Sequence, residues 1–305
     1  MNSALINTYA LNPEDGRQWS LPESIDFCKR LARSHYENFI VGSVLLPARL
    51  REHFYPIYAY CRISDDLGDE AGDPQSALQL LSGWEAELDE CYRGRPRHPV
   101  FVALRKTIDA FDIPKEPFAN LLHAFRQDQT KTRYETYGEL LEYCRFSANP
   151  VGRLVLYLFG YRDPERQSLS DSICTGLQLA NHWQDIALDY QRLNRIYLPQ
   201  EDMRRFGYAE PDLAAQTCDR RFISLLQLEV DRARECFHKG AALVKMVDSR
   251  AAFDVDLFAR SGLEVLRRIE SAGYDVFRHR PVIGKGTRLR LMMQAWLSPG
   301  KMAGS

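Results

Sequence analysis

The sequence lacks the features that identify several common classes of protein. No apolar run approaches the roughly 18–20 residues that a membrane-spanning helix needs. The N-terminus, MNSALINTYALNPEDG, has neither the basic start nor the apolar core of a signal peptide. The net charge is −1 with acids and bases mixed along the chain, so the basic excess of a nucleic-acid-binding protein is missing. These absences predict a soluble, cytoplasmic protein that binds no nucleic acid.

Cysteine motifs and nucleotide-binding motifs are also missing. The seven cysteines are scattered and include no CxxC pair, which argues against a disulfide framework or a zinc site and favours a reducing compartment. No GxGxxG, Walker A motif or nucleophile elbow occurs, so no nicotinamide-binding domain and no NADPH cofactor are expected.

The chain has no segment that separates it into domains. The 305 residues contain no linker rich in Ser, Pro or Gly and no repeat of fixed period. The clearest breaks, at 94–99 and 161–166, are short enough to be turns between helices. We therefore predict a single domain over residues 1–305, with about 18 N-terminal and about 8 C-terminal residues peripheral to it.

The periodicity of apolar residues indicates helices nearly everywhere. Apolar positions recur every three or four residues, and no pair of alternating strands joined by Asn-Gly or Asp-Gly occurs. The expected fold class is all-α, a helical bundle. Ser20 is an expected N-cap with Pro22 in the first turn, and Pro47 is expected to start the next helix. The first of these helices covers residues 21–38, and the further predicted helices cover residues 75–92, 99–111, 115–127, 135–146, 148–160, 168–191, 219–246, 252–272 and 286–297.

The segment YAYCRISDDLGDE, residues 58–70, departs from the pattern of an ordinary helix. Asp65 and Asp69 are four residues apart, so they share one helix face, with Asp66 beside them. Like charges at this spacing destabilise a helix unless a cation lies between them. Because they follow an apolar helix, they favour a charged end that projects into a cavity. A solvated helix end is an equally good interpretation of this segment alone.

A second acidic stripe lies in SICTGLQLANHWQDIALDYQRLNRIYLP, residues 172–199. Gln178, Asn181, Asp185 and Asp189 recur at spacings of three, four and four on a helix that is otherwise apolar nearly all round. Buried carboxylates cost free energy unless they are paired or bind a metal. Oxygen ligands without thiolates or a His pair favour Mg²⁺ over Zn²⁺. The alternative is a partly exposed amphipathic helix.

The two motifs together indicate a metal-dependent reaction. If their helices face each other across a bundle, four or five carboxylates converge on one point. Mg²⁺ bound in this way usually also binds phosphate oxygens of a substrate, so a diphosphate is the expected ligand and leaving group. Six bases are candidates for further contacts with it, although most are expected to be surface or capping residues: Arg62, Lys131, Arg133, Arg145, Arg153 and Arg195.

These motifs resemble those of a known family. IYAYCRISDD, LQLANHWQDIALD followed by RIYLP, and a terminal GYDVFRHRP are similar to the squalene/phytoene synthases, from His35 to Trp296. The resemblance implies an isoprenoid synthase fold with a central substrate cavity. It also implies a Mg²⁺-dependent enzyme that acts on a prenyl diphosphate.

The resemblance also implies roles for particular residues. The catalytic, metal-binding aspartates would be Asp65, Asp69, Asp185 and Asp189. Tyr58 and Tyr197 would lie near the reacting carbons. His35 would open the substrate-binding segment, and three residues would support the diphosphate: Arg62, Gln178 and Asn181.

Three segments depart from the pattern of the condensing members of this family. HYENF, residues 35–39, stands where they usually read HSxSF, Gln184 stands where they usually carry Arg, and Asn149-Pro150 lies in a segment that usually reads like G-T-V-G. These departures resemble the bacterial hydroxysqualene synthases of hopanoid biosynthesis, which implies that presqualene diphosphate and water give hydroxysqualene and diphosphate. Asn38, Asn149 and Gln184 would then position the water. For Asn149-Pro150, a simple helix start is an equally good interpretation.

Two alternatives remain open. A condensing synthase would make presqualene diphosphate, squalene or phytoene from two prenyl diphosphates. A non-catalytic relative that serves in protein assembly would be expected to have lost motif aspartates, and all four are present. Such substrates and products are apolar. The protein could therefore also contact the inner face of the membrane peripherally, or hand its product over to other enzymes of the same pathway. No segment of the sequence identifies a membrane-binding patch.

Overall fold

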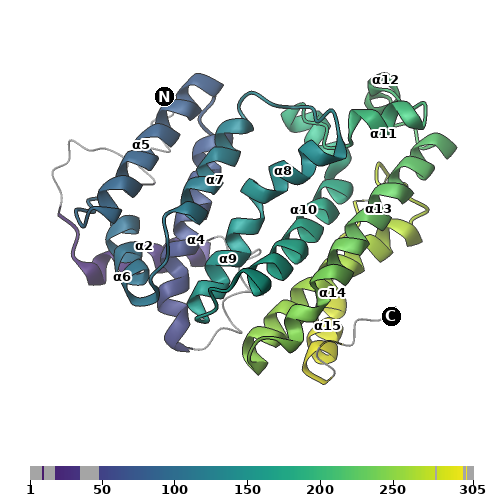
Figure 1. The fold of residues 1–305 in the computed structure, drawn as a ribbon. Coiled ribbons are helices and arrows are strands. Elements are labelled where there is room, and N and C mark those ends of the chain that lie inside the picture. The colour runs from purple at the N-terminus through teal and green to yellow at the C-terminus, as the bar shows by residue number, and fades with distance from the viewer. Residues whose placement is uncertain (1–8, 10–17, 35–47, 279, 298–299, 301–305) are drawn as a thin grey trace. The chain divides into compact units, whose positions relative to one another are not determined.

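The computed structural model describes residues 9, 18–34, 48–278, 280–297 and 300. Within these ranges the chain is helical (Figure 1), and its only β-type pairing is an isolated bridge between Arg133 and Ile196. The prediction of an all-α fold is confirmed. No helix in the described ranges is long and apolar enough to cross a lipid bilayer.

The contacts between residues divide the chain into two compact units. The first contains Met1–Thr130 and Arg153–Arg162, and the second contains Lys131–Gly152 and Asp163–Ser305. The expectation that residues 1–305 form one domain stays a prediction.

The first unit is built around the helix that carries the first acidic motif. Its helices are α2 (Leu21–Ser34), α4 (Ala48–Asp69), α5 (Pro74–Tyr92), α6 (Pro99–Phe111), α7 (Glu116–Gln127) and the larger part of α9 (Asn149–Leu158). α4 packs against α2, α5, α6 and α7 (Figure 1). Ser20 precedes α2, and its backbone amide donates to Glu23 Oε2 at 2.9 Å, which supports the predicted helix start.

An aromatic cluster fixes the rotation of α4 about its axis. Tyr60 is fully buried, stacks on Trp84 with ring centroids 6.1 Å apart, and donates its hydroxyl to the Phe118 carbonyl at 2.8 Å. Trp84 in turn donates to the hydroxyl of Ser64 at 3.0 Å. Because Tyr60 and Ser64 lie on one side of α4, the opposite side presents residues 58, 62, 65 and 69.

The second unit is built around the helix that carries the second motif. Its helices are α8 (Tyr137–Ser147), α10 (Pro164–Leu193), α11 (Gln200–Arg205), α12 (Glu210–Ala214), α13 (Arg220–Gly240), the 3₁₀ helix η2 (Ala241–Lys245), α14 (Ser249–Ser271) and α15 (Lys285–Leu297). α10, α13 and α14 run side by side, and α15 packs on α14 (Figure 1).

Glycines allow these helices to pack closely. A Cβ added at Gly262 would lie 2.2 Å from the ring of buried Phe237, and one added at Gly240 would lie 2.4 Å from the side chain of Ile173. Trp183 is fully buried and donates to the backbone carbonyl of Glu229 at 3.1 Å. α10 is therefore held against α13 on its apolar side.

Most predicted helices agree with the observed ones to within about four residues at each end. The predicted helix 219–246 is wrong as a continuous helix, because α13 ends at Gly240 and a 3₁₀ turn follows. The short helices α11 and α12 were not predicted, because six and five residues are too few for an apolar period to show. The predicted helix start at Pro47 and the stretch 35–38 lie outside the described residues.

Candidate active site

The first acidic motif lies at the C-terminal end of α4. Tyr58, Arg62, Asp65 and Asp69 are spaced four, three and four residues apart, and since α4 extends to Asp69 they share one helix face, as predicted. Asp69 is exposed, and Tyr58 is partly buried. Burial raises the pKa of the Tyr58 hydroxyl, so this group keeps its proton.

The carboxyl group of Asp65 is strongly affected by its surroundings. Its pKa is raised to about 7, first because protein atoms displace water and then because the Asp69 carboxylate lies close by. Its side chain is 44% exposed, so it remains accessible to a ligand. A cation placed between Asp65 and Asp69 would relieve this repulsion.

Asp66 has a different role from its two neighbours. It is 2% exposed, it accepts a hydrogen bond from the Tyr9 hydroxyl, and it is bound by both Nη2 and Nε of Arg62, the latter at 3.0 Å. Nη1 of Arg62 also lies 3.5 Å from Asp65. Asp66 thus holds Arg62, the expected diphosphate contact, along the motif.

The second motif forms a polar stripe on α10. Asn181 is exposed and Gln178, Asp185 and Asp189 are partly buried, while the neighbouring apolar residues Leu179, Ala180, Trp183 and Ile186 are buried. The stripe is therefore the accessible side of an otherwise buried helix. This arrangement agrees better with a partly exposed amphipathic helix than with a wholly buried one.

A cation from a distant segment binds the second motif. Arg280 contacts both carboxylate oxygens of Asp185, with Nη2 at 2.9 Å from Oδ2. This contact raises the pKa of Arg280. Sequence reasoning missed this pair because the two residues are 95 positions apart. The segment GYDVFRHRP, which contains Arg280, was the available signal.

Tyr197 belongs to a buried aromatic cluster. Its ring stacks on His182 with centroids 3.6 Å apart, and Tyr134 and Tyr143 lie at 5.7 and 5.8 Å. Burial first and Arg195 second lower the pKa of His182 to about 3, so its imidazole is neutral. His182 is therefore a buried, neutral packing partner of Tyr197.

A small cavity lies beside this cluster. Its volume is about 10 Å³, close to the smallest space that can hold one water molecule. Two predicted site residues, Asp189 and Tyr197, line this cavity. The remaining lining residues are His182, Ile186, Arg195, Ile196, Leu198 and Leu213.

Two of the three amides expected to position water, Asn149 and Gln184, lie in the described part of the chain. Asn149 is the first residue of α9, as the helix-start interpretation requires, and its side-chain oxygen accepts from the Thr175 hydroxyl at 3.0 Å. Gln184 is buried and stands one position before Asp185, about 100° round the helix. His35 and Asn38 lie outside the described residues.

Most of the other candidate bases bind acids outside the motifs. This supports the interpretation of these bases as surface or capping residues. The pairs are Lys131–Glu139, Arg133–Glu210, Arg145–Glu142 and Arg153–Glu116.

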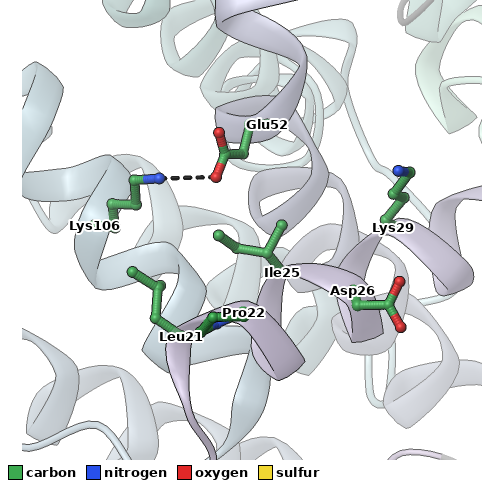
Figure 2. Close-up of a pocket in the computed structure, with 7 residues that line it drawn as sticks. All are labelled: Leu21, Pro22, Ile25, Asp26, Lys29, Glu52 and Lys106. Carbon is green, nitrogen blue, oxygen red and sulfur yellow. Dashed lines mark hydrogen bonds and ion pairs between the residues drawn. The ribbon is translucent and has the colours of Figure 1, made fainter.

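A surface pocket of about 430 Å³ lies elsewhere in the first unit (Figure 2). Its lining comes from α2, α4 and α6, and Lys106 Nζ lies 2.8 Å from Glu52 Oε1 at its rim. None of the predicted site residues lines this pocket, so it is not a candidate for the predicted chemistry.

The acidic motifs supply carboxylate oxygens, which are ligands of the kind that Mg²⁺ prefers. In the described part of the chain, no group of three or more His, Cys, Asp or Glu side chains is arranged to hold a metal alone. Each motif instead offers two carboxylates, and Mg²⁺ usually binds through one or two carboxylates together with waters and phosphate oxygens. The residues present therefore suit Mg²⁺ that is bound together with a diphosphate.

Comparisons with known proteins agree with these features. The family model described as squalene/phytoene synthase matches residues 32–287. The crystal structure of squalene synthase HpnC from Alicyclobacillus acidocaldarius is 43% identical with a TM-score of 0.80, and the match covers 88% of this chain and 99% of that chain.

Curated relatives include proteins with two different activities. The hydroxysqualene synthase of Sinorhizobium fredii is 33% identical over 276 residues, which cover 83% of this chain and 93% of the relative. The 15-cis-phytoene synthase of Synechococcus elongatus is 30% identical over 278 residues, which cover 87% of this chain and 89% of the relative.

Proposed function

The chain belongs to the squalene/phytoene synthase family, whose members act on prenyl diphosphates, and we propose that it is a Mg²⁺-dependent hydroxysqualene synthase of hopanoid biosynthesis. In the proposed reaction, presqualene diphosphate loses diphosphate, the cyclopropylcarbinyl cation rearranges, and water adds to it. The products are hydroxysqualene, diphosphate and a proton, and no NADPH is consumed. Because substrate and product are apolar, we also propose that the protein contacts the membrane peripherally and passes its product to other enzymes of the same pathway.

The observation that carries this choice is the buried, uncharged side chain of Gln184 directly before Asp185. Condensing members of the family usually carry Arg at this position. An arginine would keep its positive charge there, whereas an amide can hydrogen-bond to water without placing a second cation near the reacting cation. The similarity to the hydroxysqualene synthase of S. fredii supports the same choice.

The four motif aspartates are proposed to hold Mg²⁺ and the diphosphate: Asp65, Asp69, Asp185 and Asp189. When bound, Mg²⁺ neutralises the charge of the departing diphosphate. Arg62, which Asp66 holds in place, donates to the diphosphate oxygens. Gln178 and Asn181 extend this contact along α10, and His35 belongs to the same substrate-binding set.

The tyrosines are proposed to face the reacting carbons. The ring faces of Tyr58 and Tyr197 attract a carbocation by the interaction that aromatic rings offer to cations. His182, stacked on Tyr197, is neutral and so adds no opposing positive charge. Asn38, Asn149 and Gln184 are proposed to position the water that attacks the cation.

A condensing synthase is the second candidate. It is favoured by the similarity to the phytoene synthase of S. elongatus and to HpnC of A. acidocaldarius, which is described as a squalene synthase. Such an enzyme would join two prenyl diphosphates, and its products would form without presqualene diphosphate being supplied.

A product assay separates these functions. Purified protein with Mg²⁺ and no nicotinamide cofactor receives either presqualene diphosphate in ¹⁸O-labelled water or farnesyl diphosphate. Labelled hydroxysqualene from the first substrate alone supports the proposal, and presqualene diphosphate or a hydrocarbon from the second identifies a condensing synthase. If neither substrate releases diphosphate, the chain is a non-catalytic relative.

A pair of variants sharpens the assay. Gln184→Arg is expected to lower the yield of the alcohol relative to total diphosphate release, because the water loses its amide partner. Gln191→Arg, at an exposed position of the same helix, is the matched control and should leave the ratio unchanged. An unaltered ratio in Gln184→Arg would remove the role assigned to this residue.

A further inference from the structure

The C-terminal helix α15 exposes an apolar face. The exposed fractions are 60% for Leu289, 54% for Met293, 76% for Trp296 and 66% for Leu297. These positions follow the spacing of a single helix face. Exposed apolar residues scattered singly need no explanation, but four on one face form a surface that can bind a partner.

The opposite side of α15 is anchored to its own unit. Leu291 and Ala295 are buried, and α15 packs on α14. Arg290 Nη2 lies 3.1 Å from Glu264 Oε2, and Arg268 on α14 donates to the Thr287 hydroxyl at 2.8 Å. The packing of α15 therefore does not depend on its outer apolar side chains.

The charge of this region is unlike that of the chain as a whole. Helix α15 contains Lys285, Arg288 and Arg290 and no Asp or Glu, whereas the whole chain has a net charge of −1. Glu264, which binds Arg290, also binds Arg267 and Arg268, so this ion-pair cluster keeps a net positive charge. Arg288 and Arg290 lie about 100° to either side of Leu289, so they border the apolar face. Both arginines are exposed at their positions on the helix.

We propose that the outer face of α15 docks on the surface of an anionic lipid bilayer. A helix with an apolar stripe, a tryptophan and bordering arginines is suited to lie in the headgroup region, with the stripe in the acyl boundary and the cations at the phosphates. A second copy of this chain is a poorer occupant, since two such basic faces would repel each other. The docking surface is independent of which reaction the chain catalyses.

Vesicle binding tests this assignment on the full chain. Vesicles of phosphatidylcholine alone are compared with vesicles of equal parts phosphatidylcholine and phosphatidylglycerol in a sedimentation assay. We expect binding to the anionic vesicles that weakens as salt is added, and much weaker binding to the neutral ones. Leu289→Ser combined with Met293→Ser should lower the partition coefficient at least about tenfold.

Matched controls separate this face from general stickiness. Val151→Ser combined with Leu193→Ser removes two other exposed apolar side chains, 41% and 40% exposed, and should leave vesicle binding unchanged. Circular dichroism of each variant checks that the helices remain folded. If the folded α15 variant binds as the wild type does, or if the wild type binds neither vesicle, the assignment is overturned.

Tryptophan fluorescence gives a second, local readout. Trp84 and Trp183 are buried and Trp19 is partly buried, whereas Trp296 is 76% exposed. A blue shift on adding anionic vesicles is expected from the wild type and should be absent in Trp296→Phe, which still binds. Light scattering that shows a dimer broken by the α15 variant would assign the face to a second copy and overturn the proposal.

Discussion

The two acidic motifs obtain their positive partners in different ways. On α4 the partner is Arg62, which lies on the same helix three and four residues before Asp65 and Asp66. On α10 the partner of Asp185 is Arg280, which comes from the segment between α14 and α15. The first arrangement follows from helix spacing, and the second exists only after the chain has folded.

The difference also concerns how firmly each cation is held. Arg62 is bound to Asp66, which is 2% exposed and also receives the Tyr9 hydroxyl, so breaking this group leaves a buried charge without a partner. Arg280 and Asp185 have exposed fractions of 48% and 23%, and an ion pair this accessible contributes about 1 kcal/mol or less. We infer that Arg62 is a fixed part of the motif and that Arg280 can exchange Asp185 for another anion.

The largest expected effect comes from removing one carboxylate of either motif. Asp69→Asn and Asp189→Asn should each reduce Mg²⁺-dependent diphosphate release at least about a hundredfold, because charge on the leaving group is no longer balanced. Release is measured with presqualene diphosphate and with farnesyl diphosphate. Glu70→Gln, next to Asp69 and exposed, is the control that should stay active. Full activity in one aspartate variant would show that its motif is not used.

The two units also differ in how a buried acid is partnered, and this difference predicts how the free energy of unfolding depends on pH. Asp254 on α14 is 6% exposed, and neither of its carboxyl oxygens has a hydrogen-bond partner among the described residues, in contrast to Asp66. Burial first and Asp248 second raise its pKa from the ordinary 3.8 to about 7. Between these values the folded state keeps a proton that the unfolded chain releases, so the free energy of unfolding falls as pH rises, by up to about 4 kcal/mol.

Asp254→Asn should therefore gain stability relative to the wild type as the pH rises through this window. Urea unfolding followed by circular dichroism at a series of pH values measures the difference. Glu235→Gln, at an exposed position of α13, is a control for the loss of one acid. Parallel stability curves for Asp254→Asn and the wild type would contradict the raised pKa.

Asp66→Asn tests whether the acid between the motif aspartates is structural. We expect it to lower the free energy of unfolding by about 3 kcal/mol, since Arg62 loses its buried partner. Asp69→Asn, at an exposed position of the same helix, should change stability little. Equal effects on stability would remove the distinction drawn between Asp66 and its neighbours.

The smallest expected effect concerns Arg280. Arg280→Gln should raise the affinity of the diphosphate-free protein for Mg²⁺ about two- to fivefold, because Asp185 no longer has a competing cation. Isothermal titration calorimetry measures this change. Arg278→Gln, which removes a nearby arginine that pairs with Asp275 instead, is the matched control. An unchanged affinity in Arg280→Gln would mean that the pair does not compete with metal.

Local spacing explains what the sequence could predict. The shared face of Tyr58, Arg62, Asp65 and Asp69 follows from residue numbers alone, and so does the stripe on α10. Long-range contacts explain what was missed: Arg280 on Asp185, Tyr9 on Asp66, and the stacking of Tyr197 on His182. The break between α13 and η2 was missed for a different, local reason, since the apolar period continues through it.

The most direct test of the proposed function is the origin of the oxygen in the product. Presqualene diphosphate is incubated with the purified protein and Mg²⁺ in ¹⁸O-labelled water, without a nicotinamide cofactor. We expect one labelled oxygen in hydroxysqualene for each diphosphate released. Diphosphate release without a labelled alcohol, or products formed only from two prenyl diphosphates, would contradict it.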